Sequence, residues 1–138
     1  MRNLDGITNA YAAGLFDGEG HVGVSMHKRG DINAVVQVSM CSYETLARLQ
    51  QFWGGSLKNY GPSTKGYRTD YWRWVLSGRD NIRDFLLDVR PFLLAKAPQA
   101  DLVLSFLAST TPYQRGVEER ALRLGFYLAL KESRCAVA

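Results

Sequence analysis

Residues 12–20 read Ala12-Ala-Gly-Leu-Phe-Asp-Gly-Glu-Gly20, where helical spacing gives way to strand alternation. The spacing predicts a helix over residues 7–17, capped by Thr8 or Asn9. The glycines of the quoted stretch end that helix, because glycine readily adopts the backbone angles that a helix exit needs. Apolar and polar residues then alternate over 21–27, which predicts a half-buried strand.

The rest of the chain continues with strands and helices in a regular order. Turn residues separate two further pairs of alternating segments, so two local hairpins are expected. The expected elements are a strand over 32–40, a helix capped by Ser42 and stopped by Gly54-Gly55, strands over 56–60 and 71–77, helices over 81–89, 98–108 and 117–132, and a turn opened by Pro91.

This order predicts one α+β domain over residues 1–138. Each strand pair is joined locally, so the sheet is expected to be antiparallel. The helices would cover its apolar face, with Trp53, Trp72 and Trp74 in the core between them. The other face would be polar and open to solvent or to a ligand.

The composition is that of an ordinary globular chain, with 46% hydrophobic and 22% charged residues. No apolar run reaches the roughly 18–20 residues that span a bilayer, so no membrane partner is expected. The N-terminus lacks the features of a signal or transit peptide, which predicts a soluble, intracellular protein of the cytoplasm, nucleoid or an organelle matrix. The net charge of +4 favours a polyanionic partner.

The two cysteines, Cys41 and Cys135, have neither CxxC spacing nor a nearby pair of histidines. A structural zinc site and a disulfide framework are therefore not expected, and both thiols are expected to be reduced. No small-molecule cofactor is expected either.

The stretch 12–20 resembles the signature motif of the LAGLIDADG homing endonucleases. The match holds at Ala13, Gly14, Leu15, Asp17 and Gly20, with Phe16 and Glu19 as similar substitutions and Ala12 and Gly18 as departures. The resemblance extends through Gln37-Val-Ser39, Gly55-Ser-Leu-Lys58 and the run from Arg90 to Leu104. It covers residues 7 to about 110 and points to the single-motif, homodimeric branch. It implies an α-β-β-α-β-β-α fold with a saddle-shaped antiparallel sheet that binds double-stranded DNA.

A single copy of the motif implies that a complete enzyme needs two chains. Ala10, Ala13 and Gly14 lie on adjoining parts of one helix surface and would let two such helices pack closely. Asp17 is expected to be a structural hydrogen-bonding residue at this helix pair. Each helix would deliver Glu19 to the subunit junction, where two carboxylates would repel unless a divalent cation bridged them.

By resemblance, Glu19 and the backbone carbonyl of Gly18 hold Mg²⁺ or another divalent cation such as Mn²⁺. Oxygen ligands suit Mg²⁺, and metal ions supply the activated water and the charge stabilisation that phosphodiester hydrolysis needs. Lys96 matches the active-site lysine of the family. The implied activity is a metal-dependent double-strand break in a long, pseudo-palindromic site, as in intron homing.

A two-stranded ribbon fits the major groove of DNA, so side chains on the polar face of the sheet are the expected contacts. Arg suits guanine and Asn or Gln suits adenine, whereas Lys28 and Lys65 are expected at phosphates. The expected DNA contacts are His21, Ser25, His27, Lys28, Arg29, Asn33, Gln37, Lys58, Tyr60, Lys65, Arg68, Tyr71 and Arg73.

Simpler interpretations stay open beside these. Without the wider match, Glu19 would be interpreted as a surface acid at a helix end, and Lys96 as a surface lysine. The polar face of the sheet would be interpreted as a solvated face. Met40 and Glu44 stand where the family commonly has polar or basic groups, although Arg48 could substitute. The alternative is thus a non-cleaving relative that acts as an RNA-splicing maturase or a DNA-binding regulator. A dimerisation module without a nucleic-acid partner is a third hypothesis.

Overall fold

The structure of the chain is a computed structural model that describes residues 8–28, 30–62, 70–112 and 116–136. Its elements are α1 (Asn9–Glu19), β1 (Gly20–Met26), β2 (Ile32–Met40), α2 (Tyr43–Trp53), β3 (Ser56–Pro62), β4 (Asp70–Leu76), α3 (Arg79–Val89), the 3-10 helix η1 (Arg90–Phe92), α4 (Ala97–Ser109) and α5 (Val117–Ala136). The expected order of helices and hairpins is confirmed. None of the helices in these ranges is long and apolar enough to cross a bilayer.

α1 begins as predicted but ends differently. The Thr8 hydroxyl accepts a hydrogen bond from the backbone N–H of Tyr11 at 3.0 Å, as a helix N-cap does. The helix runs to Glu19, beyond the predicted end, and Gly20 has an extended backbone with a φ of −87°. The prediction that this glycine supplies special exit angles is therefore wrong. A Cβ at Gly20 would lie 2.1 Å from the Phe16 ring, so glycine is needed there for the close approach of strand and helix.

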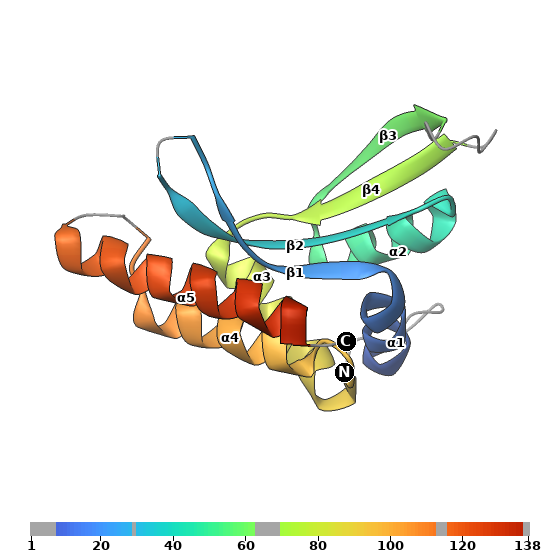
Figure 1. Cartoon of the computed structure of the whole chain (residues 1–138). Helices are drawn as coiled ribbons and strands as arrows, with labels where there is room; N and C mark the ends of the chain where they lie inside the picture. The colour runs from blue at the N-terminus through green and yellow to red at the C-terminus, as the bar shows by residue number, and fades with distance from the viewer. Residues whose placement is uncertain (1–7, 29, 63–69, 113–115, 137–138) are drawn as a thin grey trace.

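Four antiparallel strands form one sheet in the order β1-β2-β4-β3. β1 and β2 form the first hairpin, with Gly20 opposite Val38. β3 and β4 form the second, and β2 joins the two hairpins by pairing with β4, with Ser39 opposite Arg73. The hairpins rise at opposite ends of the sheet, so the face turned away from the helices is concave (Figure 1). The predicted antiparallel sheet is confirmed, and its curvature agrees with the expected saddle.

The later helices differ from prediction mainly at their ends. The Ser42 hydroxyl caps α2 by accepting from the Thr45 N–H at 3.3 Å, and Gly54 ends that helix with a positive φ of 78°, where a side chain would be strained. α3 starts directly after Gly78, ahead of the predicted residue 81, because the two residues before 81 contain no helix breaker. α5 likewise continues past its predicted end to Ala136.

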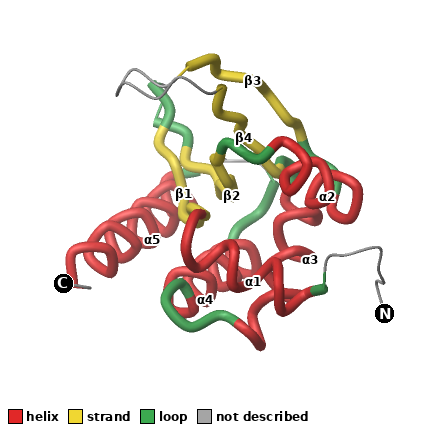
Figure 2. The backbone as a smooth tube through the Cα atoms, turned by 90° about the vertical axis from the view of Figure 1, so that its right-hand side faces the viewer, coloured by secondary structure: helices red, strands yellow, loops and turns green. Residues whose placement is uncertain are grey.

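The helices cover one face of the sheet, and the strands lie together on the other side of the molecule (Figure 2). The Phe85 ring of α3 lies where helices and sheet meet. It makes edge contacts with Phe16 at 5.3 Å, with Trp53 at 5.0 Å and with Trp74 at 5.3 Å between ring centroids. All four rings are buried, and each such burial contributes about 1.5–3 kcal/mol. Trp53 and Trp74 are core residues as predicted, and Trp72 packs half-buried against them.

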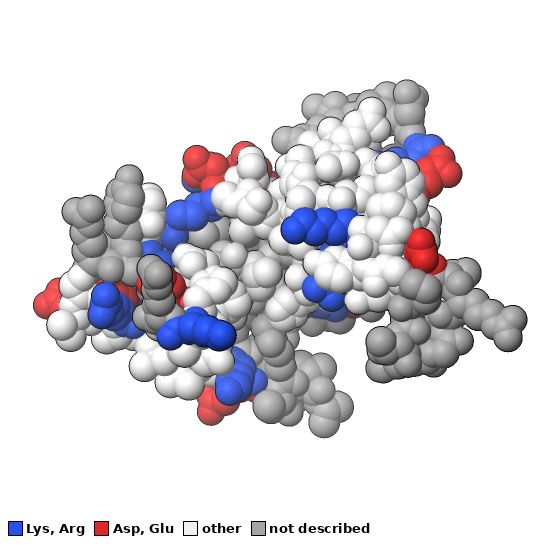
Figure 3. All heavy atoms as spheres, turned by 90° about the horizontal axis from the view of Figure 1, so that it is seen from above, with Lys and Arg blue, Asp and Glu red and all other residues white. Residues whose placement is uncertain are grey.

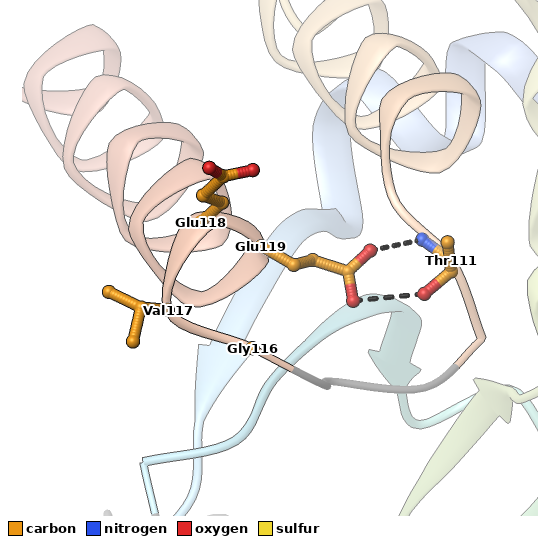
Figure 4. Close-up of a pocket in the computed structure, with 5 residues that line it drawn as sticks. All are labelled: Thr111, Gly116, Val117, Glu118 and Glu119. Carbon is orange, nitrogen blue, oxygen red and sulfur yellow. Dashed lines mark hydrogen bonds between the residues drawn. The ribbon is translucent and has the colours of Figure 1, made fainter.

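A buried arginine ties the last helix to the sheet. Arg123 of α5 is 1% exposed and donates hydrogen bonds to the backbone carbonyls of Ile32 and Thr111. The Glu119 side chain points at Thr111 and accepts from its hydroxyl at 2.9 Å and from its backbone N–H (Figure 4). Because Ile32 begins β2 directly after the turn of the hairpin, these bonds connect α5 to the turn end of the β1–β2 hairpin. The pocket beside the start of α5 is lined by Thr111 and Glu119, so it belongs to this structural network.

Candidate active site and nucleic-acid surface

Glu19 is the last residue of α1 and is exposed to solvent. Gly18 before it is exposed as well, and Gly20 after it begins β1. Glu19 therefore lies where α1 runs into β1, a junction that can be followed in Figure 1. Its exposure leaves the Glu19 side chain accessible to a ligand.

Lys96 is held at the same end of α1 by Asp17. The two carboxylate oxygens of Asp17 accept hydrogen bonds from the backbone N–H groups of Leu94, at 2.8 Å, and Lys96, at 2.9 Å. The Lys96 ammonium in turn donates to the backbone carbonyl of Asp17 at 2.7 Å. A cation at a helix C-terminus is also favoured by the helix dipole. Two predicted catalytic residues far apart in sequence, Glu19 and Lys96, are thus brought to one end of one helix.

The oxygen donors at this end of α1 are few in one chain. Within the ranges that the structure describes, no three His, Cys, Asp or Glu side chains form a metal-binding group. The Asp17 carboxylate is occupied by two backbone amides, which leaves the Glu19 carboxylate and the Gly18 carbonyl as neighbouring hard donors. Mg²⁺ commonly binds one or two carboxylates, with waters and phosphate completing the shell. The donor set fits a divalent cation shared with a substrate phosphate or a second chain.

The sheet face turned away from the helices, the open face, carries most of the predicted DNA contacts. Strand alternation places their side chains opposite the buried Val22, Val36 and Trp74. The described residues of the open face are His21, Ser25, Asn33, Val35, Gln37, Ser39, Ser56, Lys58, Tyr60, Tyr71, Arg73 and Val75.

Strand pairing arranges the open face in rows. His21 lies opposite Gln37, which lies opposite Val75 on β4. Ser39, Arg73 and Lys58 form the neighbouring row across β2, β4 and β3. The sequence prediction omitted Val35, Ser39, Ser56 and Val75, although strand alternation indicates all four.

The other predicted contacts lie at the hairpin tips or outside the described residues. His27 and Lys28 are exposed just beyond the end of β1. A turn closes this hairpin, in which the His27 carbonyl accepts from the Gly30 N–H at 2.8 Å. Three predicted contacts, Arg29, Lys65 and Arg68, lie outside the residues that the structure describes.

The charge on the open face is basic. None of its described residues is an Asp or a Glu, whereas Lys58 and Arg73 lie side by side on it. Figure 3 shows the molecule from this side, with Lys and Arg atoms within the face and Asp and Glu atoms mainly toward its margins. The nearest acid on β4, Asp70, accepts from the Asn59 amide at 2.9 Å instead. Such a surface is suited to a polyanion.

Only some of the predicted interface residues on α1 face outward. Ala10 and Gly14 are exposed and lie one turn apart, and Gly18 continues the line. Ala13 is fully buried in its own chain, so it presents no surface to a partner. A Cβ built at Gly14 or Gly18 meets nothing within 4 Å, so both glycines border open space.

The unusual residues of β2 and α2 have ordinary structural environments. Met40 pairs with Trp72 and is packed partly buried against the core rather than toward the open face. Glu44 is exposed and forms an ion pair with Arg48 at 3.3 Å along the surface of α2. Arg48 is thus engaged with its own helix.

The sequence profile of the LAGLIDADG-like domain matches residues 7–89. Among the curated proteins, no sequence matches significantly. Solved structures do match. An archaeal intron-encoded homing endonuclease, I-Vdi141I, complexed with DNA, has a TM-score of 0.72 at 14% identity, covering 91% of this chain and 82% of that one.

Two further homing endonucleases share the architecture. I-CvuI, in complex with a DNA target in the presence of Mg, has a TM-score of 0.61 at 17% identity, over 89% of this chain and 94% of that chain. A mutant of I-SmaMI has a TM-score of 0.66 at 20% identity, over 91% of this chain but only 44% of that chain. These similarities establish the fold.

Proposed function

Since this chain belongs to the LAGLIDADG-like domain family, we propose that it is a sequence-specific DNA endonuclease that cuts both strands as a metal-dependent homodimer. The observation that carries the proposal is the position of Glu19. Its exposed carboxylate ends α1, beside Lys96 and directly before the strand that opens the carboxylate-free face of the sheet. DNA lying on that face would bring a phosphate to the end of α1.

Glu19 and the Gly18 carbonyl would hold the divalent cation, Mg²⁺ or Mn²⁺. When bound, the cation supplies an activated water and an electrophilic contact to the scissile phosphate. Crystal structures of I-CvuI were obtained with the I-CreI target in the presence of Mg, where the DNA was not cleaved, and with its own target in the presence of Ca. The chain's own donors are hard oxygens, which is the chemistry that such cations require.

Two chains would complete the site. Among the residues that the structure describes, Glu19 is the one accessible carboxylate at the end of α1. The match spans 94% of the I-CvuI chain but only 44% of the I-SmaMI chain, as one unit of a longer chain would. The exposed, small side of α1 at Ala10, Gly14 and Gly18 would let two such helices approach closely. Their C-terminal ends would then place two Glu19 carboxylates at one junction.

Lys96 would stabilise negative charge on the phosphate. Its ammonium is fixed on the Asp17 carbonyl, and a donor held in this way requires little reorganisation when charge develops nearby. Asp17 keeps the backbone of residues 94 and 96 in place, so it positions the lysine without touching the substrate. The open face binds the duplex and sets its register.

The test uses a plasmid that carries the DNA flanking the gene, incubated with and without Mg²⁺. Wild type is expected to linearise it only with the metal, and Glu19→Gln is expected to bind the same DNA without cutting it. Glu118→Gln, which changes an exposed glutamate on α5, serves as the matched control and should cut normally.

Three results would contradict the proposal. Wild-type cutting rates in Glu19→Gln would remove this residue from the mechanism. A wild type that binds the DNA but leaves it intact would refute the endonuclease activity. Absence of DNA binding even at low salt would refute the nucleic-acid partner itself, because phosphate contacts are strongest there.

A further inference from the structure

Arg73 on β4 is held on both sides in the middle of the open face. Its Nε donates a hydrogen bond to the Ser39 hydroxyl on β2 at 3.0 Å. Its guanidinium lies 4.6 Å from the centre of the Tyr60 ring, a cation–π contact from the β3 side. Tyr60 is itself stacked on Tyr71, with ring centroids 5.5 Å apart and an interplanar angle of 18°. The arginine plane is therefore oriented before any ligand arrives.

The donors at the tip of Arg73 remain available to a ligand. A guanidinium has five N–H donors, and the Nε bond to Ser39 uses one of them. In the part of the chain that the structure describes, no residue accepts a hydrogen bond from the two terminal nitrogens. These nitrogens form the rigid fork that matches two adjacent acceptors.

In the absence of a ligand, a positively charged neighbour destabilises this arrangement of Arg73. Lys58 lies directly opposite Arg73 on the adjacent strand, and like charges in that position are destabilising. No described carboxylate of the open face offsets the pair, because Asp70 is turned to Asn59. A ligand that offers hydrogen-bond acceptors would relieve the repulsion.

The place of Arg73 in the sheet indicates whether this ligand is a base or a phosphate. β4 is an inner strand of the sheet, so Arg73 lies toward the floor of the concave face rather than at a rim. Phosphates of a duplex in a concave surface run along the rims, whereas base edges in the major groove face the floor. The O6 and N7 atoms of guanine are the paired acceptors that an arginine fork recognises there.

From these observations we infer that Arg73 recognises a guanine in each half of the DNA site, with Ser39, Tyr60 and Tyr71 as the residues that position it. This inference rests on the proposed function. The guanine would lie near the cut, since Arg73 pairs with Ser39, the residue after Val38, and Val38 pairs with Gly20, which directly follows Glu19. Two strand spacings, about 10 Å, separate β4 from β1 across β2.

The test selects bound duplexes from a randomised DNA pool at fixed salt without Mg²⁺, so that binding is read apart from cleavage. Wild type is compared with Arg73→Gln, which removes the fork and the charge, and with Arg73→Lys, which keeps the charge alone. Arg83→Gln, on α3 beneath the sheet, is the control for losing one positive charge. Thermal melting of each variant verifies that it is folded.

Wild type and Arg83→Gln are expected to enrich guanine at one symmetric pair of positions. Arg73→Gln should lose that preference by about 5- to 150-fold, the discrimination of one bidentate pair. Arg73→Lys, which keeps an ammonium donor but not the fork, should keep only part of the preference, and both variants should keep the preferences elsewhere. If Arg73→Gln keeps the guanine preference, or weakens binding to all sequences equally, Arg73 does not recognise the base and the inference is wrong while the proposed function stands. If wild type binds no DNA, both fail together.

Discussion

Replacing Asp17 with asparagine tests whether this carboxylate holds the segment that carries Lys96. Two hydrogen bonds from backbone N–H groups, of Leu94 and Lys96, end on the two oxygens of Asp17. An asparagine retains one acceptor oxygen but turns an NH₂ donor toward the second N–H. Asp17→Asn therefore loses one hydrogen bond, and in the other the charged acceptor is replaced by a neutral one.

The magnitude follows from these two bonds. A hydrogen bond to a charged group contributes about 1.5–3 kcal/mol and a neutral one about 0.5–1.5 kcal/mol. The difference between two charged bonds and one neutral bond is about 2.5–4.5 kcal/mol, and the half-buried setting of Asp17 favours the lower end. At about 2.5 kcal/mol, the melting temperature of a domain of this size should fall by about 5–10 °C.

Far-UV circular dichroism melting and amide hydrogen exchange would measure the effect. Asp84→Asn is the control, because Asp84 is an exposed aspartate whose ion pair with Arg83 contributes little. The Asp17 variant should also lose exchange protection at the amides of residues 94 and 96. Melting no lower than that of the Asp84 control, with both amides still protected, would refute the reasoning.

Three other substitutions probe separate features. Gly14→Gln adds a side chain where a Cβ meets nothing in its own chain, so the fold should tolerate it while the proposed dimer dissociates in analytical ultracentrifugation; an unchanged dimer would refute the α1 interface. Gly20→Ala puts a Cβ against the Phe16 ring and should cost about 1–3 kcal/mol in chemical denaturation, whereas an undestabilised variant would show that the junction has room. Hydrogen bonding to Arg90 lowers the pKa of Asp101. The pair therefore stabilises the folded state at pH values above the ordinary aspartate pKa of about 3.9, and this stabilisation is lost as the pH falls through the lowered pKa. The melting difference between wild type and Asp101→Asn should accordingly shrink between pH 6 and about pH 2.5; a constant difference would contradict the pairing.

Local features were predictable because they depend on neighbours in the chain. Thr8 and Ser42 are N-caps as expected, and strand alternation identified which face of β2 and β4 is buried. The sequence predicts the end of α1 too early, because the close contact of Gly20 with Phe16 depends on the packing of a buried ring rather than on backbone propensity. It also predicts Ala13 on the outside of α1, because small residues lie on both sides of that helix and their spacing does not say which side is buried.

By itself, the sequence determined the element order, the apolar and polar faces and the family motif around Glu19, since all three are written in local spacing and residue type. Only the tertiary structure decided that Asp17 binds the segment of Lys96 and that β2 pairs with β4. That strand pairing places Ser39 against Arg73. Contacts between residues this far apart depend on how helices and hairpins pack, because local periodicity states which face is buried but not which partner buries it.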